Sequence, residues 1–91
     1  MTAQEHLALI HELPCVVCLN NYGHRVNATE AHHLESYRHK DSNYATVPLC
    51  NDCHSLLHQM RRRPFYNLHH LDDVKILALT VKLIVNHLEA K

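Results

Sequence analysis

The chain has little of several features that mark common classes of protein. Nine lysine and arginine residues balance nine aspartate and glutamate residues, so the net charge is zero with histidine neutral. Such a chain is not expected to coat DNA through a strongly basic surface, although zero net charge is compatible with local binding of nucleic acid. The longest mostly apolar stretch, Ile76 to Val85, is interrupted by Thr80 and Lys82 and is too short for a transmembrane helix. The sequence therefore predicts neither a DNA-coating protein nor a membrane protein.

The sequence also has no apolar N-terminal run with a cleavage site, no internal repeat and no low-complexity segment. Without a secretory signal we expect a cytoplasmic protein, and in that compartment paired cysteines hold a metal ion more often than they form disulfides. We expect residues 1–91 to form one domain. Because so short a chain buries a modest core, a metal or disulfide staple is typical of domains of this size.

Sequence patterns predict a helix at each end of the chain. Thr2 and Glu5 have the spacing of a capping box, and the helix expected over residues 2–13 ends before Pro14. A second helix is expected over residues 72–89, with an aspartate as its cap. Its apolar residues repeat at helical spacing: Val74, Leu77, Val81, Ile84 and Leu88. We interpret this stripe as part of the core, with a dimer interface as the alternative.

Shorter elements are expected between these helices. Residues 20–23 are typical of a turn, residues 24–34 are expected to form a pair of strands, and the polar residues 36–43 a loop. Residues 44–49 are expected to be extended, because Pro48 disfavours a helix.

A further helix is expected from Cys53 to about Arg62. Asn51 or Asp52 would cap this helix, and Pro64 would end it.

Two Cys-x-x-Cys pairs, Cys15/Cys18 and Cys50/Cys53, form the strongest motif in the chain. Two residues between thiols let a tight turn direct both sulfurs at one tetrahedral zinc ion. A disulfide or a thioredoxin-like redox motif is the alternative, but two such pairs in one cytoplasmic domain favour structural zinc. Because zinc binding is coupled to folding, we expect the metal-free chain to be largely unfolded.

The spacing between the two cysteine pairs is unusually long. Thirty-one residues separate Cys18 from Cys50, whereas a plain zinc ribbon has about 15–20 residues there. The excess is enough for an inserted hairpin and loop, so we expect the function to be built between the pairs.

Histidine is over-represented, with 11 residues in the chain. His32 and His33 lie between the cysteine pairs. His54 and His58 are four residues apart on the helix predicted from Cys53 to about Arg62, so these two share a face of that helix. Either pair alone is often a surface feature, and His69-His70 is an example with no partner motif. Because zinc would fix His54 beside Cys53 and the region before His32 through Cys18, we expect these four histidines to converge.

These motifs together resemble a known family. The Cys-x-x-Cys pair is followed by Glu-Ala-His-His-Leu and then by Val-Pro-Leu-Cys-Asn-Asp-Cys-His-Ser-Leu-Leu-His. This arrangement, over about Cys15 to His58, resembles the HNH endonucleases with a zinc-bound ββα-metal fold, the phage recombination-associated type above all. The resemblance implies a small α+β domain whose zinc-stapled ββα-metal core spans about residues 14–63, with flanking N- and C-terminal helices.

The resemblance also implies roles for individual residues. His33 would be the general base that activates water, and His32 and His54 would be ligands of a catalytic divalent ion. His58 would complete the ligand set or contact the scissile phosphate. Glu30 matches an acidic position of the colicin nucleases, two residues before the histidine pair, where it would help to orient the site.

One family position differs in this chain. Family members usually carry an asparagine five residues before the second cysteine pair, where it braces the loop that holds the general base. This chain has Ala45 there, and Asn43 is a candidate substitute.

The sequence as a whole predicts a metal-dependent endonuclease of low sequence specificity, acting on nucleic acid, with DNA favoured over RNA. The expected cofactors are structural Zn²⁺ and a catalytic Mg²⁺, Mn²⁺, Ni²⁺ or Zn²⁺ ion. Four basic residues would contact the flanking phosphates: Arg38, Lys40, Arg61 and Arg62. The alternative is that they are ordinary surface charges. A catalytically weak or inactive zinc-knuckle binding module is the alternative function. The chain is expected to be a monomer or a homodimer through its C-terminal helix.

Overall fold

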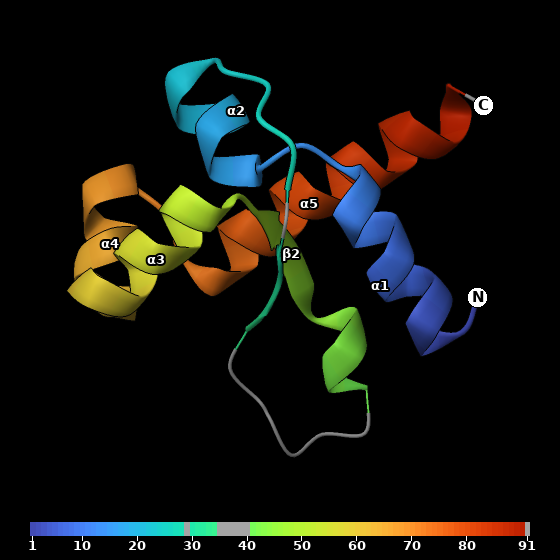
Figure 1. The fold of residues 1–91 in the computed structure, drawn as a ribbon, viewed down its shortest axis with the longest axis horizontal. Helices are drawn as coiled ribbons and strands as arrows, with labels where there is room; N and C mark the ends of the chain where they lie inside the picture. The colour runs from blue at the N-terminus through green and yellow to red at the C-terminus, as the bar shows by residue number, and fades with distance from the viewer. Residues whose placement is uncertain (29, 35–40, 91) are drawn as a thin grey trace.

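The fold is small and of the α+β class. A computed structural model describes residues 1–28, 30–34 and 41–90 (Figure 1). Within these ranges the chain forms five α-helices, one 3-10 helix and a two-stranded antiparallel sheet. The elements are α1 (Ala3–Glu12), α2 (Val16–Tyr22), β1 (Glu30–His33), η1 (Ser42–Tyr44), β2 (Thr46–Leu49), α3 (Asn51–Met60), α4 (Arg62–His69) and α5 (Asp73–Glu89). None of the described helices has the length and apolar character needed to cross a membrane.

The two terminal helices begin with side-chain caps. The Thr2 hydroxyl oxygen accepts from the backbone N–H of Glu5, and the Glu5 carboxylate accepts from the backbone N–H of Thr2. These two bonds form the predicted capping box and satisfy donors that a helix start leaves unpaired. At the start of α5 the Asp72 carboxylate accepts from the backbone N–H of Lys75 at 2.7 Å.

The sheet pairs β1 with β2 over a long sequence separation. The two strands are antiparallel, with Glu30 opposite Leu49 and His33 opposite Thr46. The predicted strand pair over residues 24–34 is therefore wrong, because its second half pairs with residues 46–49 instead. The residues before β1 bond instead to the segment that precedes the first cysteine pair, where the Ala28 N–H donates to the Leu13 carbonyl.

Two helices were not predicted. The turn expected over residues 20–23 is wrong, because α2 continues to Tyr22 and only Gly23 leaves the helix, with a φ of 68°. The helix expected from Cys53 to about Arg62 is also wrong in its bounds, since α3 begins at Asn51 and ends at Met60. Pro64 does not end a helix but lies in the first turn of α4, where its missing N–H breaks no intrahelical bond.

The core surrounds β2, which is buried along its whole length. β2 contacts α1, α2, α3 and α5, and Figure 1 shows α5 crossing the strand. The largest completely buried apolar side chains come from all parts of the chain: Ile10, Leu13, Val17, Val47, Leu49, Phe65 and Ile76. The sheet thus fixes β1 and the start of α3 against one common core.

The apolar stripe expected to pack α5 into the core is right only in part, because Leu77 packs against the core and three other members of the stripe do not. Val74, Val81 and Leu88 are exposed at 80%, 49% and 48%. The residues of α5 that are buried are Ile76 and Thr80 instead. Because α5 is apolar on most of its circumference, helical spacing alone does not determine which side faces the core.

Candidate metal centre and histidine cavity

The four cysteines form one cluster. Their sulfur atoms all lie within 4.8 Å of one another, and all four residues carry free thiols. The Cys18 Sγ lies 3.7 Å from the Cys50 Sγ and 3.6 Å from the Cys53 Sγ. Four thiolates around a tetrahedral zinc ion, each at about 2.3 Å, lie about 3.8 Å apart. The cluster therefore suits a structural metal ion such as zinc.

Helix starts position these sulfurs. Cys15 is the N-cap of α2 and Cys50 is the N-cap of α3, so Cys18 and Cys53 fall in the first turn of each helix. The Cys50 Sγ accepts from the backbone N–H of Cys53 at 3.5 Å. Helix N-termini stabilise thiolates, and thiolates are the form that binds metal.

Burial and contacts between sulfurs shift the pKa values of three of the thiols in opposite directions. The Cys53 thiol donates to Cys15 and lowers the pKa of Cys15 to about 5. Burial raises the pKa of Cys18 to about 12. The bond to Cys15 and burial also raise the pKa of Cys53. Without a cation, one thiolate thus forms at the cost of its neighbours, whereas a divalent ion stabilises all four as thiolates.

Three histidines from two elements lie together beside the cysteine cluster. His32 comes from β1, and His54 and His58 come from successive turns of α3. The His32 ring centroid lies 5.2 Å from that of His54 and 6.3 Å from that of His58. The Nε2 atoms of His54 and His58 are 3.1 Å apart. The structure thus brings together all three histidines that the sequence assigned to a second metal ion.

Their nitrogens fit a shared ion in part. Two imidazole ligands at about 2.1 Å from one ion lie about 3.0–3.4 Å apart, as His54 and His58 do. Among the described residues, however, only the cysteines form a group of three or more whose ligand atoms all lie within 4.8 Å of one another. Joint ligation by the three histidines therefore requires the His32 ring to approach the other two.

Glu30 and burial prepare these rings as ligands. The Glu30 carboxylate lies 3.4 Å from Nδ1 of His54, which leaves Nε2 of that ring for a ligand. A carboxylate behind a histidine is a common way to orient a metal ligand. Burial first, and then the nearby His54 and His58, lower the pKa of His32 to about 4, so this ring is neutral at pH 7.

Side chains alternate along a strand, so His33 leaves β1 on the face opposite to His32; because His33 is the last residue of β1, it still borders the same cavity as His32. Its Nε2 is 2.8 Å from the Oδ1 atom of Asn43, so a protonated Nε2 can donate to the amide oxygen. This pairing leaves Nδ1 of His33 with a lone pair. Asn43 thus supplies His33 with an amide contact that the methyl side chain of Ala45 cannot make.

One cavity of about 150 Å³ collects residues from β1, α3, α4 and α5. His32, His33 and His58 line it, and so do Arg61 and Arg62, two of the four predicted phosphate contacts. Arg38 and Lys40, the other two, lie outside the described residues.

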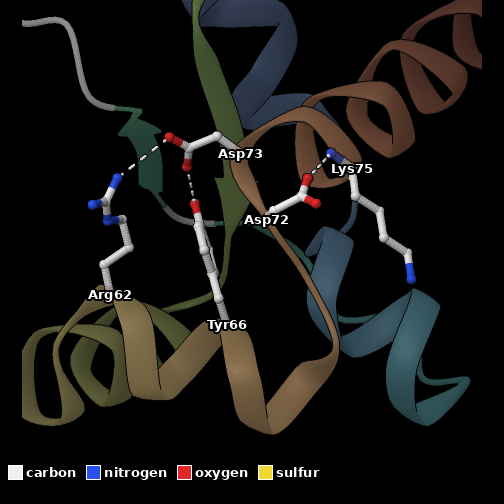
Figure 2. A network of polar contacts seen from close by, with 5 residues as sticks. All are labelled: Arg62, Tyr66, Asp72, Asp73 and Lys75. Atoms are coloured by element: carbon white, nitrogen blue, oxygen red, sulfur yellow. Dashed lines mark hydrogen bonds and ion pairs between the residues drawn. The ribbon is translucent and has the colours of Figure 1, made fainter.

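Two residues of this cavity had no sequence signal that marked them. Tyr66 and Asp73 line it as well, and Figure 2 shows the Tyr66 hydroxyl and the Arg62 guanidinium meeting the Asp73 carboxylate. The two distances are 2.7 Å and 3.4 Å. An apolar-aromatic pattern over residues 65–69 would have indicated α4, but nothing in the sequence places Asp73 beside α4.

Comparisons with family models, with curated proteins and with solved structures find no match for this chain. The function therefore has to be argued from the site itself.

Proposed function

We propose that this chain is a metal-dependent endonuclease of the HNH type, which hydrolyses phosphodiester bonds in nucleic acid, with DNA favoured over RNA. One observation carries the proposal. The antiparallel pair β1–β2 and the following α3 bring His32 beside His54 and His58. The β-β-α order, with a cysteine pair at the start of α3, supports the ββα-metal core that the resemblance implies.

His32, His54 and His58 would hold a divalent ion beside the cysteine cluster. Imidazole nitrogens suit Ni²⁺ and Zn²⁺, whereas Mg²⁺ and Mn²⁺ prefer oxygen ligands. When bound, such an ion supplies positive charge that offsets the charge gathering on a phosphate during hydrolysis. Glu30 orients His54 through its Nδ1 atom, 3.4 Å away.

His33 would act as the general base. Neutral imidazole accepts a proton well near neutral pH, and Nδ1 of His33 keeps its lone pair when Nε2–H donates to Asn43. Because His33 lines the same cavity as His32 and His58, a water molecule between base and phosphate fits the arrangement. Asn43 would hold the imidazole in one tautomer, whereas the family asparagine, which is Ala45 here, braces the loop that holds the base.

A zinc-stapled binding module without catalysis is the second candidate. Two observations favour it: the net charge is zero, and the family asparagine is replaced by Ala45. The contact between His33 and Asn43 weighs against it, because a module that only binds has no need of an oriented imidazole.

A plasmid assay separates the two candidates. Zinc-loaded protein is incubated with supercoiled plasmid and added Mg²⁺, Mn²⁺ or Ni²⁺, with EDTA in a parallel series. The proposal expects nicked plasmid that depends on the added ion and is absent with His58→Gln. His24→Gln, an exposed histidine outside the cavity, is the matched control and should nick as fast as wild type. Binding of plasmid without cleavage under any ion would establish the binding module instead.

A further inference from the structure

The link between α3 and α4 has a backbone conformation that ordinary residues avoid. Arg61 has a φ of 76° and a ψ of 161°. This region is populated almost entirely by glycine, because a Cβ atom makes it unfavourable. The conformation is fixed from both sides, since the Arg61 N–H donates to the Leu57 carbonyl and the Arg61 carbonyl accepts from Phe65 N–H. A glycine would satisfy both bonds without the strain.

The Arg61 side chain lies at the histidine cavity, and no described residue pairs with its guanidinium. Arg61 is exposed and lines the cavity together with His32 and His58. Among the described residues, no hydrogen bond or ion pair to the Arg61 guanidinium is found. Arg62 differs, because its guanidinium lies 3.4 Å from the Asp73 carboxylate that connects α4 to α5 (Figure 2). The two adjacent arginines thus have different surroundings.

The charges around the cavity suit an anion at Arg61. Asp73 is a negative group of the cavity, and it already accepts from the Tyr66 hydroxyl and pairs with Arg62. These two contacts partly compensate the charge of Asp73, so Asp73 repels an anion bound in the cavity less strongly. Guanidinium presents several donors in one plane, which matches two oxygens of a phosphate at once.

We propose that Arg61 is the side chain that binds the phosphate group in the histidine cavity, and that its strained backbone is what holds the guanidinium there. Arg62 has a structural role in this arrangement, as the link from α4 to Asp73. The assignment rests on the proposed action on nucleic acid, since it takes the phosphate to be one of a polynucleotide.

Three variants test the proposal. Arg61→Ala removes the guanidinium and keeps the strain, whereas Arg61→Gly removes both. Arg63→Ala is the matched control, because Arg63 is also exposed, has the same charge and does not line the histidine cavity. Affinity is measured by fluorescence anisotropy of a short labelled DNA duplex with zinc-loaded protein and no second ion. Inorganic phosphate is titrated separately while the imidazole NMR signals of the histidines are followed.

The proposal expects both Arg61 variants to lose duplex affinity by about ten- to a hundredfold, as for the loss of one charge-assisted phosphate contact. Arg63→Ala should lose much less. Phosphate should shift the His32 and His58 signals in wild type but not in Arg61→Ala. Arg61→Gly should melt about 4–8 °C above Arg61→Ala, because the strain is relieved.

Equal loss of affinity in Arg61→Ala and Arg63→Ala would overturn the assignment, because it would show general electrostatic attraction alone. An equal Tm for the glycine and alanine variants would overturn the role given to the backbone. These readouts do not depend on cleavage. If wild type binds phosphate through Arg61 but never nicks plasmid, the inference about Arg61 stands and the nuclease proposal fails.

Discussion

Removal of the metal from the cysteine cluster is expected to unfold the chain. Three of the four cysteines, Cys15, Cys50 and Cys53, belong to the main buried cluster, together with Val47 and Leu49 of β2. The sheet has two strands of four residues each, and a two-stranded sheet is marginal by itself. The metal site therefore connects α2, α3 and the sheet at their common centre.

The magnitudes favour complete unfolding over local loosening. A domain of 91 residues has a free energy of unfolding of roughly 5–14 kcal/mol, at about 0.05–0.15 kcal/mol per residue. Binding of structural zinc by four ligands contributes about 10–16 kcal/mol in small zinc domains. The contribution of the ion is thus as large as the whole stability, and little is left when it is removed.

The assay follows helix content and zinc together. Zinc-loaded protein is treated with a strong chelator, and far-UV circular dichroism is recorded beside the release of zinc. We expect one zinc ion per chain, loss of most of the helical signal with its release, and recovery on adding zinc back. Cys53→Ser should behave like the chelated protein, and Ser55→Ala, an exposed residue of α3, like wild type. A chelated chain that keeps its helical signal and a cooperative melting transition would refute the reasoning.

Three further predictions concern His6, Asn43 and the exposed side of α5. Burial lowers the pKa of His6, so the unfolded chain binds a proton at a higher pH than the folded chain does, and the free energy of unfolding falls as the pH drops below about 6.5. Urea unfolding of the zinc-saturated His6→Leu variant should show a smaller fall over this pH range. A fall equal to that of wild type would contradict burial of His6 as the cause. Asn43→Ala should lower the nicking rate by about 10–100-fold, because His33 loses the group that orients it. Asn43→Asp should have a rate between those of wild type and Asn43→Ala. Wild-type rates in both variants would show that Asn43 has no role in the site. The exposed apolar stripe of α5 should cause concentration-dependent self-association, measured by light scattering, that Val81→Lys abolishes.

Sequence reasoning succeeded where one short motif carries its own physical signal. The Thr2–Glu5 capping box and the Asp72 cap mark where α1 and α5 begin. The two Cys-x-x-Cys pairs predicted the cluster that the structure contains, because their spacing alone directs sulfurs at one point. His54 directly follows Cys53, whereas His32 lies 14 residues after Cys18 and reaches His54 through the pairing of β1 with β2.

Sequence reasoning failed where neighbours in space decide the outcome. The three arginines before Pro64 are typical of a helix end, yet α4 begins there because Phe65, Tyr66 and His69 bury one face. His69 illustrates this well: it has no motif, but its Nε2 lies 2.7 Å from the Tyr22 hydroxyl of α2. This contact joins α2 and α4, two helices that were not predicted, so no local sequence pattern indicates it.

The side of α5 that faces the core is a similar case. Apolar residues surround most of the helix, and only the position of β2 and α2 selects Ile76 and Thr80 for burial. The place of Asp73 in the histidine cavity depends on this orientation, which is why a site residue from the C-terminal helix was not predicted.

The nuclease proposal depends most directly on His33. Its removal is expected to lower the rate of ion-dependent plasmid nicking by about 10²–10⁴-fold, the usual contribution of a general base. His33 is exposed, so His33→Ala should keep its zinc, its circular dichroism and its Tm. His11→Ala, an exposed histidine of α1, is the matched control and should nick at the wild-type rate. A purified, zinc-loaded His33→Ala protein that nicks plasmid as fast as wild type would contradict the account.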